Sequence, residues 1–346
     1  MRCNVSAALL LLLSAVQGPS TGLSAPSNND VLGFPIYYIN LDSRPDRREN
    51  MEKMLGAQPH ARISATTTQG VQDMLANGTL VCKAKVVTAF SSRGEFKSAR
   101  SSTFSLAEVA TTHSHLSAIQ RAYNNNDEMA LVLEDDIELV RTKLEEMRLS
   151  EGNWNRTACM IRELLHSAPQ GWEILQLLSN NNQTVMSALK ESHRSYIPWS
   201  LKHWGAMAYV INRAGQRKLM EKFHQGGHQY LGKQHINADR WIYLVLQSYT
   251  ATYFPFNLRW KLGSDIQNTN FNFDLSKARE AHCHRLITQY SLPKSKCRPS
   301  PQHQGNKRPP HHAPYSTSPP MPSARTGSTV QRARNLTLTH RTMIYM

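Results

Sequence analysis

The sequence has few cysteines, no P-loop and no internal repeat. Only five of the 346 residues are cysteine, and none of them forms a Cys-x-x-Cys pair, which excludes a thioredoxin-type redox motif. The pattern Gly-x-x-x-x-Gly-Lys-Ser/Thr is also missing, so the chain does not bind nucleotides as a P-loop NTPase does. Without a repeat, solenoid and propeller architectures are excluded. The length allows one large domain or two small ones with a sizeable core.

Acidic residues are absent from Leu292 to the C-terminus. Nine Lys and Arg residues lie there, so this tail carries most of the formal net charge of +15 and leaves only +6 for the rest. The tail is rich in Pro, Ser, Thr and His and poor in large apolar residues, so it cannot bury enough surface to order itself. We expect a basic, disordered tail over residues 292–346, with a polyanion-binding role left open. The mildly basic remainder indicates no specific nucleic-acid partner.

The chain also lacks an apolar run long enough to cross a bilayer comfortably. The run over residues 7–16 follows Arg2 and leads into small and polar residues through Ala25. This order is typical of a cleaved secretory signal peptide, here residues 1–25, with a short signal-anchor as the alternative. We therefore expect no stable transmembrane span.

Cysteine and asparagine patterns agree with export. Four cysteines follow the signal, an even number that permits up to two disulfides of unknown pairing: Cys82, Cys159, Cys283 and Cys297. Patterns for glycan attachment begin at Asn77, Asn155, Asn182 and Asn335. The chain is expected in the secretory pathway, either in the ER or Golgi lumen or secreted.

The most informative stretch is the apolar run MALVL at residues 129–133, which stops in Glu134, Asp135 and Asp136. Five apolar residues are too few for a helix and predict a strand buried on both faces of a parallel sheet. Ligands of open α/β sheets bind at the carboxyl ends of strands. Carboxylates at such an end can hold a hard divalent cation that is shared with a substrate phosphate. The alternative is a solvated turn after a core strand.

Strands and helices alternate along the chain, which predicts an α/β nucleotide-binding fold. Strands are expected at residues 34–41, 129–133, 171–178 and 204–211. Helices are expected from a cap at Ser43 to Gly56, from a Ser105/Glu108 capping box to Tyr123, over 141–166, and from a cap at Asn212 to Phe223. Residues 62–70 are expected to form a polar turn, and residues 71–104 show no clear period.

The first predicted helix begins with Arg44, Arg47 and Arg48, although the helix dipole favours negative groups there. An anion such as a nucleotide diphosphate at that helix start would explain the mismatch. The alternative is a surface helix whose arginines are paired in salt bridges.

Two histidines and two aspartates are further candidates for ligand binding and acid–base chemistry. His113 and His115 are two residues apart on a helix and point away from each other, so they make a poor zinc pair, although one of them can still face a ligand. Asp239 opens an apolar run as an N-cap or as a functional acid. Asp265 is a second candidate acid, with a plain turn as its alternative.

Several of these pieces occur in an order that resembles glycosyltransferase family 25. They are Tyr38-Ile39-Asn40-Leu41-Asp42 with Arg44 and Arg47, Ser114-His115-Leu116, Leu133-Glu134-Asp135-Asp136, residues 204–212, Asp239, and Ser264-Asp265-Ile266. The family includes bacterial lipooligosaccharide galactosyltransferases and animal collagen galactosyltransferases. The resemblance implies a GT-A-like, Rossmann-type nucleotide-sugar-binding domain, which we place over residues 34–291.

The resemblance also implies a reaction and roles for residues. A hexose, commonly galactose from UDP-galactose, would move to a hydroxyl of a glycan or glycoprotein with inversion, aided by Mn²⁺ or another divalent cation. Glu134 and Asp136 match an Asp-x-Asp-like metal motif. The candidate donor contacts are Asn40, Asp42, Arg44, Arg47, His115 and Asp135. Asp239 is the first candidate for the general base and Asp265 the second.

Departures from the family pattern leave the acceptor undefined. Thr111-Thr112-His113 stands where the family often has cysteine, and the chain has no ER-retention ending. The alternative from another class is a secreted, non-catalytic pseudoenzyme that binds sugars or polyanions. The intact acid cluster argues against that alternative. Oligomeric state is not indicated.

Overall fold

The computed structural model describes residues 32–87, 103–141, 154–179, 185, 187, 194–233 and 236–259. The predicted features that lie outside these residues are the signal peptide, the first half of the helix expected over 141–166, the glycan pattern at Asn182, Asp265, the two cysteines Cys283 and Cys297, and the tail. Within the described ranges, no helix is both long and apolar enough to cross a membrane.

A seven-stranded sheet forms the centre, in the order β2-β1-β6-β10-β8-β13-β9. Its strands are β1 (Ile36–Asn40), β2 (His60–Ser64), β6 (Met129–Glu134), β8 (Ile174–Gln176), β9 (Tyr196–Pro198), β10 (Ala208–Asn212) and β13 (Ser248–Ala251). Strands β2, β1, β6, β8 and β13 run parallel, whereas β10 and β9 run against their neighbours. The expected α/β class is confirmed, with a mostly parallel sheet.

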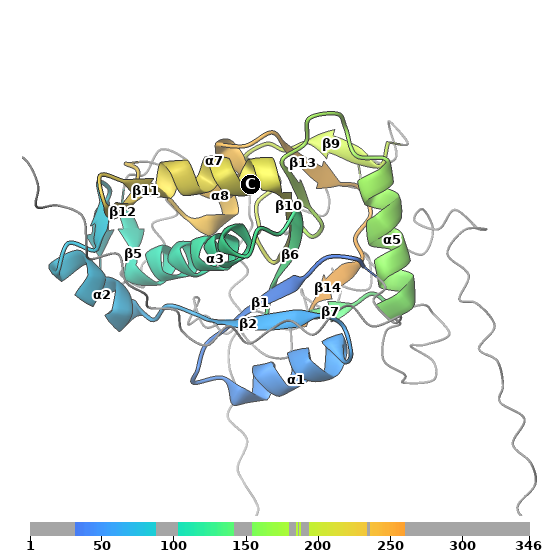
Figure 1. The fold of residues 1–346 in the computed structure, drawn as a ribbon, viewed down its shortest axis with the longest axis horizontal. Helices are drawn as coiled ribbons and strands as arrows, with labels where there is room; N and C mark the ends of the chain where they lie inside the picture. Colours follow the sequence, from blue (N-terminus) through green and yellow to red (C-terminus); the bar gives the residue numbers. More distant parts are fainter. Residues whose placement is uncertain are drawn as a thin grey trace, which may run out of the picture. The chain divides into compact units, whose positions relative to one another are not determined.

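Helices cover both faces of this sheet. One face is covered by α3 (Leu106–Asn124), α7 (Arg213–Phe223) and α8 (Ala238–Leu244), and α2 (Thr68–Ala76) packs against α3 in the same apolar core. The other face packs against α1 (Pro45–Leu55) and α5 (Trp154–His166). Figure 1 shows α3, α7 and α8 on one side of the sheet and α1 on the other. The fold therefore has three layers, with one apolar core between the sheet and the helices on each of its faces.

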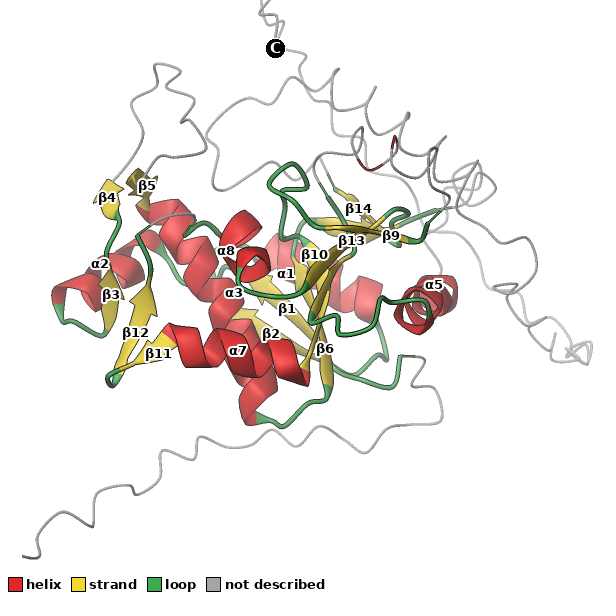
Figure 2. Ribbon diagram, turned by 90° about the horizontal axis from the view of Figure 1, so that it is seen from above, coloured by secondary structure: helices red, strands yellow, loops and turns green. Residues whose placement is uncertain are grey.

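Three small sheets complete the described fold. Strands β3 (Leu80–Cys82), β11 (His224–Gln225) and β12 (His228–Leu231) form one, β4 (Lys85–Val87) and β5 (Thr103–Ser105) form another, and β7 (Ile137–Leu139) and β14 (Phe256–Leu258) form the third. Figure 2 shows β3, β11 and β12 near α2, at the end away from α5.

Strand β6 lies inside the sheet, as its apolar sequence predicted. Ala130 and Val132 belong to the core under α3, and Leu131 and Leu133 belong to the opposite core. Alternate side chains of a strand point to opposite faces, so a run without polar residues satisfies both cores. One expectation was wrong: β6 has a parallel neighbour in β1 but an antiparallel one in β10.

The helix caps agree with the sequence at two of three places. The Ser105/Glu108 capping box is present, and the Asn212 side chain accepts the Gly215 N–H at 3.0 Å. Ser43 is not the cap of α1, which is Arg44. Because Pro45 takes the first helical position and holds the preceding residue out of the helical region, the helix cannot begin earlier.

Other element boundaries were wrong. Residues 60–87 contain β2, α2, β3 and β4 rather than only irregular chain. These elements are short, and β2 is a partly exposed edge strand whose pairing with β1 outweighs its weak apolar pattern. Strand β8 is shorter than expected, and β10 begins at Ala208 rather than at Trp204.

Two glycines at equivalent helix positions provide a matched test of packing. Each donates its N–H to the cap side chain of its helix, but a Cβ on Gly215 would lie 2.6 Å from the backbone O of Glu173, whereas a Cβ on Gly70 would meet only side-chain atoms at 3.4 Å or more. We expect Gly215→Ala to lower the free energy of unfolding by roughly 2–3 kcal/mol through overpacking. Gly70→Ala should be neutral or stabilise by up to about 1 kcal/mol. Urea unfolding measures both, and equal stabilities would contradict the described contact of α7 with Glu173.

Candidate functional site

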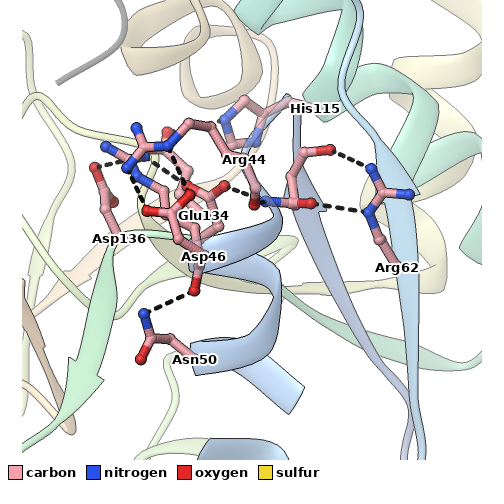
Figure 3. Close-up of polar contacts among 10 residues, drawn as sticks. Arg44, Asp46, Asn50, Arg62, His115, Glu134 and Asp136 are labelled. Carbon is pink, nitrogen blue, oxygen red and sulfur yellow. Dashed lines mark hydrogen bonds and ion pairs between the residues drawn. The ribbon is translucent and has the colours of Figure 1, made fainter. Parts of the chain in front are cut away.

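The acidic residues after β6 lie at the carboxyl edge of the sheet. Strands β1, β6 and β8 are parallel, so their carboxyl ends meet at this edge. The turn from β1 to α1 lies next to the end of β6, because Ile39 is the register partner of Glu134. Figure 3 shows the polar side chains gathered here. Ligands of such sheets bind at this edge.

Asp135 is paired inside the protein. Its carboxylate accepts hydrogen bonds from Asn40 Nδ2 and from Arg47 Nη1, each at 2.7 Å. The Arg47 side chain is only 4% exposed and that of Asp135 only 10%. Asn40 Nδ2 also donates to the carbonyl of Arg44 at 3.0 Å. Asp135 therefore fastens the end of β6 to the β1–α1 turn.

Glu134 is held from the other side, by His115 of α3. Nε2 of His115 lies 3.1 Å from Glu134 Oε1, and its Nδ1 lies 3.2 Å from the hydroxyl of Tyr209 on β10. Burial lowers the pKa of His115 to about 4, so the ring is neutral at neutral pH. Burial also raises the pKa of Tyr209, which keeps its proton. The arrangement that satisfies an ionised Glu134 has Tyr209 donating to Nδ1 and Nε2–H donating to the carboxylate.

Asp136 has the least compensated carboxylate of the three. Its Oδ2 lies 3.7 Å from Arg47 Nη1, and its buried Oδ1 has no hydrogen-bond partner among the described residues. Burial and then the charge of Glu134 raise the pKa of Asp136 well above its usual value. Burial and then the charge of Asp135 do the same to the pKa of Glu134. An added cation would relieve both carboxylates.

The two carboxylates of Glu134 and Asp136 fit a hard divalent cation that takes its remaining oxygen ligands from a substrate. The side chains of Glu134 and Asp136 are 24% and 22% exposed, so both reach the open side of the edge. Over the described part of the chain, no group of three or more His, Cys, Asp or Glu side chains could hold a metal by itself. Magnesium-type sites commonly take one or two carboxylates from the protein and further oxygens from substrate phosphates.

Two of the three arginines at the start of α1, Arg44 and Arg47, are in ion pairs, as the alternative proposed from sequence states, but Arg47 is buried rather than on the surface. Arg44 pairs with the exposed Asp46 at 2.8 Å, and Arg47 pairs with Asp135. Figure 3 shows the Arg44 and Asp46 side chains at the start of α1. The use of Arg44 and Arg47 as donor contacts stays a prediction.

Asp42 and Asn40 are linked to strand β2. Arg62 donates to Asp42 and, through Nε, to Asn40 Oδ1 at 2.9 Å. Ser64 Oγ donates to Asp42 at 3.0 Å. The hydrogen bond from Arg62 lowers the pKa of Asp42, which is thereby kept ionised. The expected role of Asn40 and Asp42 in donor binding is not tested by these contacts.

Asp239 is not a helix cap. The cap of α8 is Asn237, and Asp239 lies inside the first turn, which leaves the alternative of a functional acid. Burial and then the charge of Glu134 raise the pKa of Asp239 to about 6, while His115 and Arg240 oppose the rise. Asp239 thus shares the electrostatic surroundings of Glu134 and His115, although 105 positions separate it from Glu134.

Sequence reasoning missed Arg62 and Tyr209. Tyr209 lies in the run Ala208–Asn212, where nothing local distinguishes it from a core aromatic residue. Arg62 lies on a short edge strand that was expected to be a turn. Each acquires its role from a neighbouring strand, so only the pairing of β2 with β1 and of β10 with β6 reveals it.

Comparison with known proteins identifies the family. Residues 34–230 match the profile of glycosyltransferase family 25, described as an LPS biosynthesis protein. The chain belongs to glycosyltransferase family 25. The matched range contains every candidate site residue of this family member except Asp239 and Asp265. Membership implies a sugar transferase that uses a nucleotide-sugar donor and a glycan acceptor.

Other comparisons add nothing to this family assignment. No curated protein matches the chain. One similar solved structure is the mannose-1-phosphate geranyltransferase from Thermus thermophilus, which is 9% identical and aligns over 65% of this chain and 75% of that one with a TM-score of 0.29. A likeness this weak carries no argument about the fold or the reaction of the family-25 chain.

The two ion pairs at the start of α1 should differ sharply in their effect on stability. Asp135→Ala leaves the buried Arg47 guanidinium without its closest partner, so we expect a loss of about 3–5 kcal/mol in the free energy of unfolding. Asp46→Ala breaks the exposed pair with Arg44 and should leave stability near that of the wild type. Denaturant unfolding of both variants measures this difference, and similar losses would contradict the assigned burial.

The raised pKa of Asp239 predicts a pH-dependent stability. The folded state keeps a proton on Asp239 up to about pH 6, whereas the unfolded chain loses it near pH 4. This contribution is complete below pH 4 and is lost as the pH rises to 6. With a chelator present, the stability of Asp239→Asn relative to wild type should therefore increase between pH 4 and pH 7, by about 3 kcal/mol. A constant difference between the two unfolding curves would contradict the shift.

Proposed function

We propose that this family-25 chain is a metal-dependent hexosyltransferase with a GT-A-like arrangement of its donor site. It transfers a hexose, with galactose from UDP-galactose as the favoured donor, to a hydroxyl of a glycan or glycoprotein. The observation that carries the proposal is the buried Oδ1 of Asp136, which has no hydrogen-bond partner within the described ranges and lies two residues beyond Glu134. Two carboxylates whose pKa values are raised by burial and by the charges of neighbouring carboxylates favour a bound cation.

Glu134 and Asp136 would hold the divalent cation, for which we propose Mn²⁺. When bound, it would neutralise charge on the departing nucleotide diphosphate. The surrounding contacts support this role. The ion pair of Asp135 with Arg47 fastens the end of β6 to the start of α1, and His115 orients Glu134. The protein thus presents its two ligands from a rigid strand end.

The donor nucleotide is proposed to lie on the β1 side of the acid pair. Asp42 and Arg44 lie in the β1–α1 turn, close to Asn40 and Arg47. Asn40, Arg47 and Asp135 would form the floor of the donor site through their mutual hydrogen bonds, and His115 would act through Glu134. Turns that follow the strands at this edge commonly receive the phosphates of nucleotides.

Asp239 is the proposed general base, and Asp265, outside the described residues, is the second candidate. As the acceptor oxygen attacks the anomeric carbon, its proton would pass to the Asp239 carboxylate while the bond from carbon to the diphosphate oxygen breaks. Attack opposite the leaving group inverts the anomeric centre. A pKa near 6 suits a base that must be ionised at neutral pH and still accept a proton.

We also propose that the chain acts in the secretory pathway. The signal-like N-terminus and the glycan acceptor patterns support this location. Cys159 is disulfide-bonded, which fits an oxidising compartment, while Cys82 carries a free thiol.

The acid pair provides the direct test of the reaction. Purified full-length protein should release UDP from UDP-galactose in the presence of Mn²⁺, and Asp136→Asn should lower this turnover by at least about 100-fold, since a ligand should matter at least as much as an outer-sphere partner. The matched control is Asp73→Asn, an exposed acid on α2 that is not a candidate site residue and should retain wild-type turnover. Mn²⁺ should raise the melting temperature of the wild type but not that of Asp136→Asn.

Equal turnover of Asp136→Asn and wild type would remove the assigned metal ligand. Absence of turnover with every UDP-sugar tried, together with retained sugar or polyanion binding, would favour the non-catalytic alternative.

A further inference from the structure

Trp204 is a large aromatic residue whose side chain is exposed to solvent. Three large apolar side chains are exposed in the described ranges: Leu201 at 39%, Trp204 at 43% and Leu244 at 44%. Leu201 and Leu244 line a hollow of about 630 Å³ together with Trp199 and Tyr243, and Trp204 is not part of that lining. Single exposed apolar residues are common on proteins, so the position of Trp204 must decide its meaning.

The register of the sheet places Trp204 at the edge that carries the acid pair. Strand β10 runs against β6, and the Glu134 N–H donates to the carbonyl of Met207 at 2.8 Å. Trp204 precedes Met207 by three residues, a distance of at most about 11 Å of extended chain. Its carbonyl accepts a hydrogen bond at 3.3 Å from Ser179, just beyond the carboxyl end of β8.

The backbone around Trp204 is held by buried donors. Gln176 Nε2 donates to the carbonyls of His203 and Gly205, at 2.8 and 2.6 Å. Thr250 in turn donates to Gln176 Oε1 at 2.8 Å. Because the residues on both sides of Trp204 are anchored to the sheet, a ligand that packs on the indole does not have to order the loop first.

The side of the acid pair indicates which substrate could reach Trp204. In the sheet, β6 lies between β1 and β10, so the proposed donor contacts on β1 and Trp204 before β10 flank Glu134 and Asp136 from opposite sides. Helix α8, which carries Asp239, contacts the same loop, because the Tyr243 hydroxyl donates to the Gly205 carbonyl at 3.2 Å. The side with Trp204 is therefore the side with the proposed general base.

We propose that Trp204 is a platform for the acceptor sugar, on which the apolar C–H face of a pyranose ring packs beside the acid pair. This inference rests on the proposed function. A flat indole offers a large apolar surface at small entropic cost, and the nearby carboxylates accept hydrogen bonds from the hydroxyls at the ring edge. A docked ring would bring its hydroxyl to the side where Asp239 can take the proton.

Saturation-transfer NMR on the full-length protein tests the platform without turnover. The probes are the methyl glycosides of galactose, glucose, mannose and N-acetylglucosamine, each with UDP and Mn²⁺ present. At least one probe should receive saturation on its ring C–H protons from the wild type. For that probe, Trp204→Ala should weaken binding by about tenfold, the size of one aromatic contact, and Trp204→Phe should restore part of it.

Leu244→Ala is the matched control, because Leu244 is as exposed as Trp204 but lines the separate hollow. It should bind the same probe as the wild type does, and all variants should melt at the wild-type temperature. The platform is overturned if the wild type transfers saturation to none of the four probes, if Trp204→Ala binds as the wild type does, or if Leu244→Ala weakens binding equally.

The two proposals fail in distinguishable ways. A wild type that turns over UDP-galactose but binds no glycoside overturns the platform and keeps the proposed reaction. A wild type that binds a glycoside through Trp204 but turns over no UDP-sugar keeps the platform and removes the proposed reaction.

Discussion

The structure depends on how three adjacent carboxylates are accommodated where a fully buried strand ends. Each carboxylate repels the others and loses hydration on burial, which is costly unless the charge is paired and hydrogen-bonded. Asp135 turns toward α1 and is neutralised by Arg47. Glu134 turns toward α3 and meets the neutral His115. Asp136 keeps one buried oxygen without a partner among the described residues. Two of the acids thus have partners inside the protein, and the third carries a negative charge that a bound cation would compensate.

The reversed strand β10 gives this edge two different sides. If β10 had been parallel, its carboxyl end would lie at the acid edge, and the loop preceding it would lie at the other edge. Because it is antiparallel, the loop before it, with Trp204 and Gly205, comes next to Glu134. The edge therefore combines a turn after one strand with a loop before another. In the proposed reaction, this combination would place the donor and the acceptor on opposite sides of Glu134 and Asp136.

Local signals were sufficient for the elements whose hydrogen bonds are local. The Ser105/Glu108 box begins α3 and Asn212 begins α7, because side chain and backbone partners are three residues apart. The apolar run of β6 was equally clear. Strand β2 and helix α2 were not foreseen, since the weak pattern of β2 is supported by pairing with β1 across a whole helix. The sequence also did not show that the Asp135 side chain points into the protein, because its partners Asn40 and Arg47 are about 90 positions away.

The amino-acid sequence alone determined that a buried strand of an α/β protein ends in acid, and that the family is glycosyltransferase family 25. The strand prediction follows from the order of residues along the chain, and the family follows from a resemblance in several ordered motifs that the family profile confirms; neither depends on knowing the contacts. Only the tertiary structure decided which acid is paired with arginine, which is held by histidine and which keeps an oxygen without a partner in the part of the chain that the structure describes. The reason is physical: burial and charge pairing are properties of the space around a side chain, and that space is formed by segments far apart in the sequence.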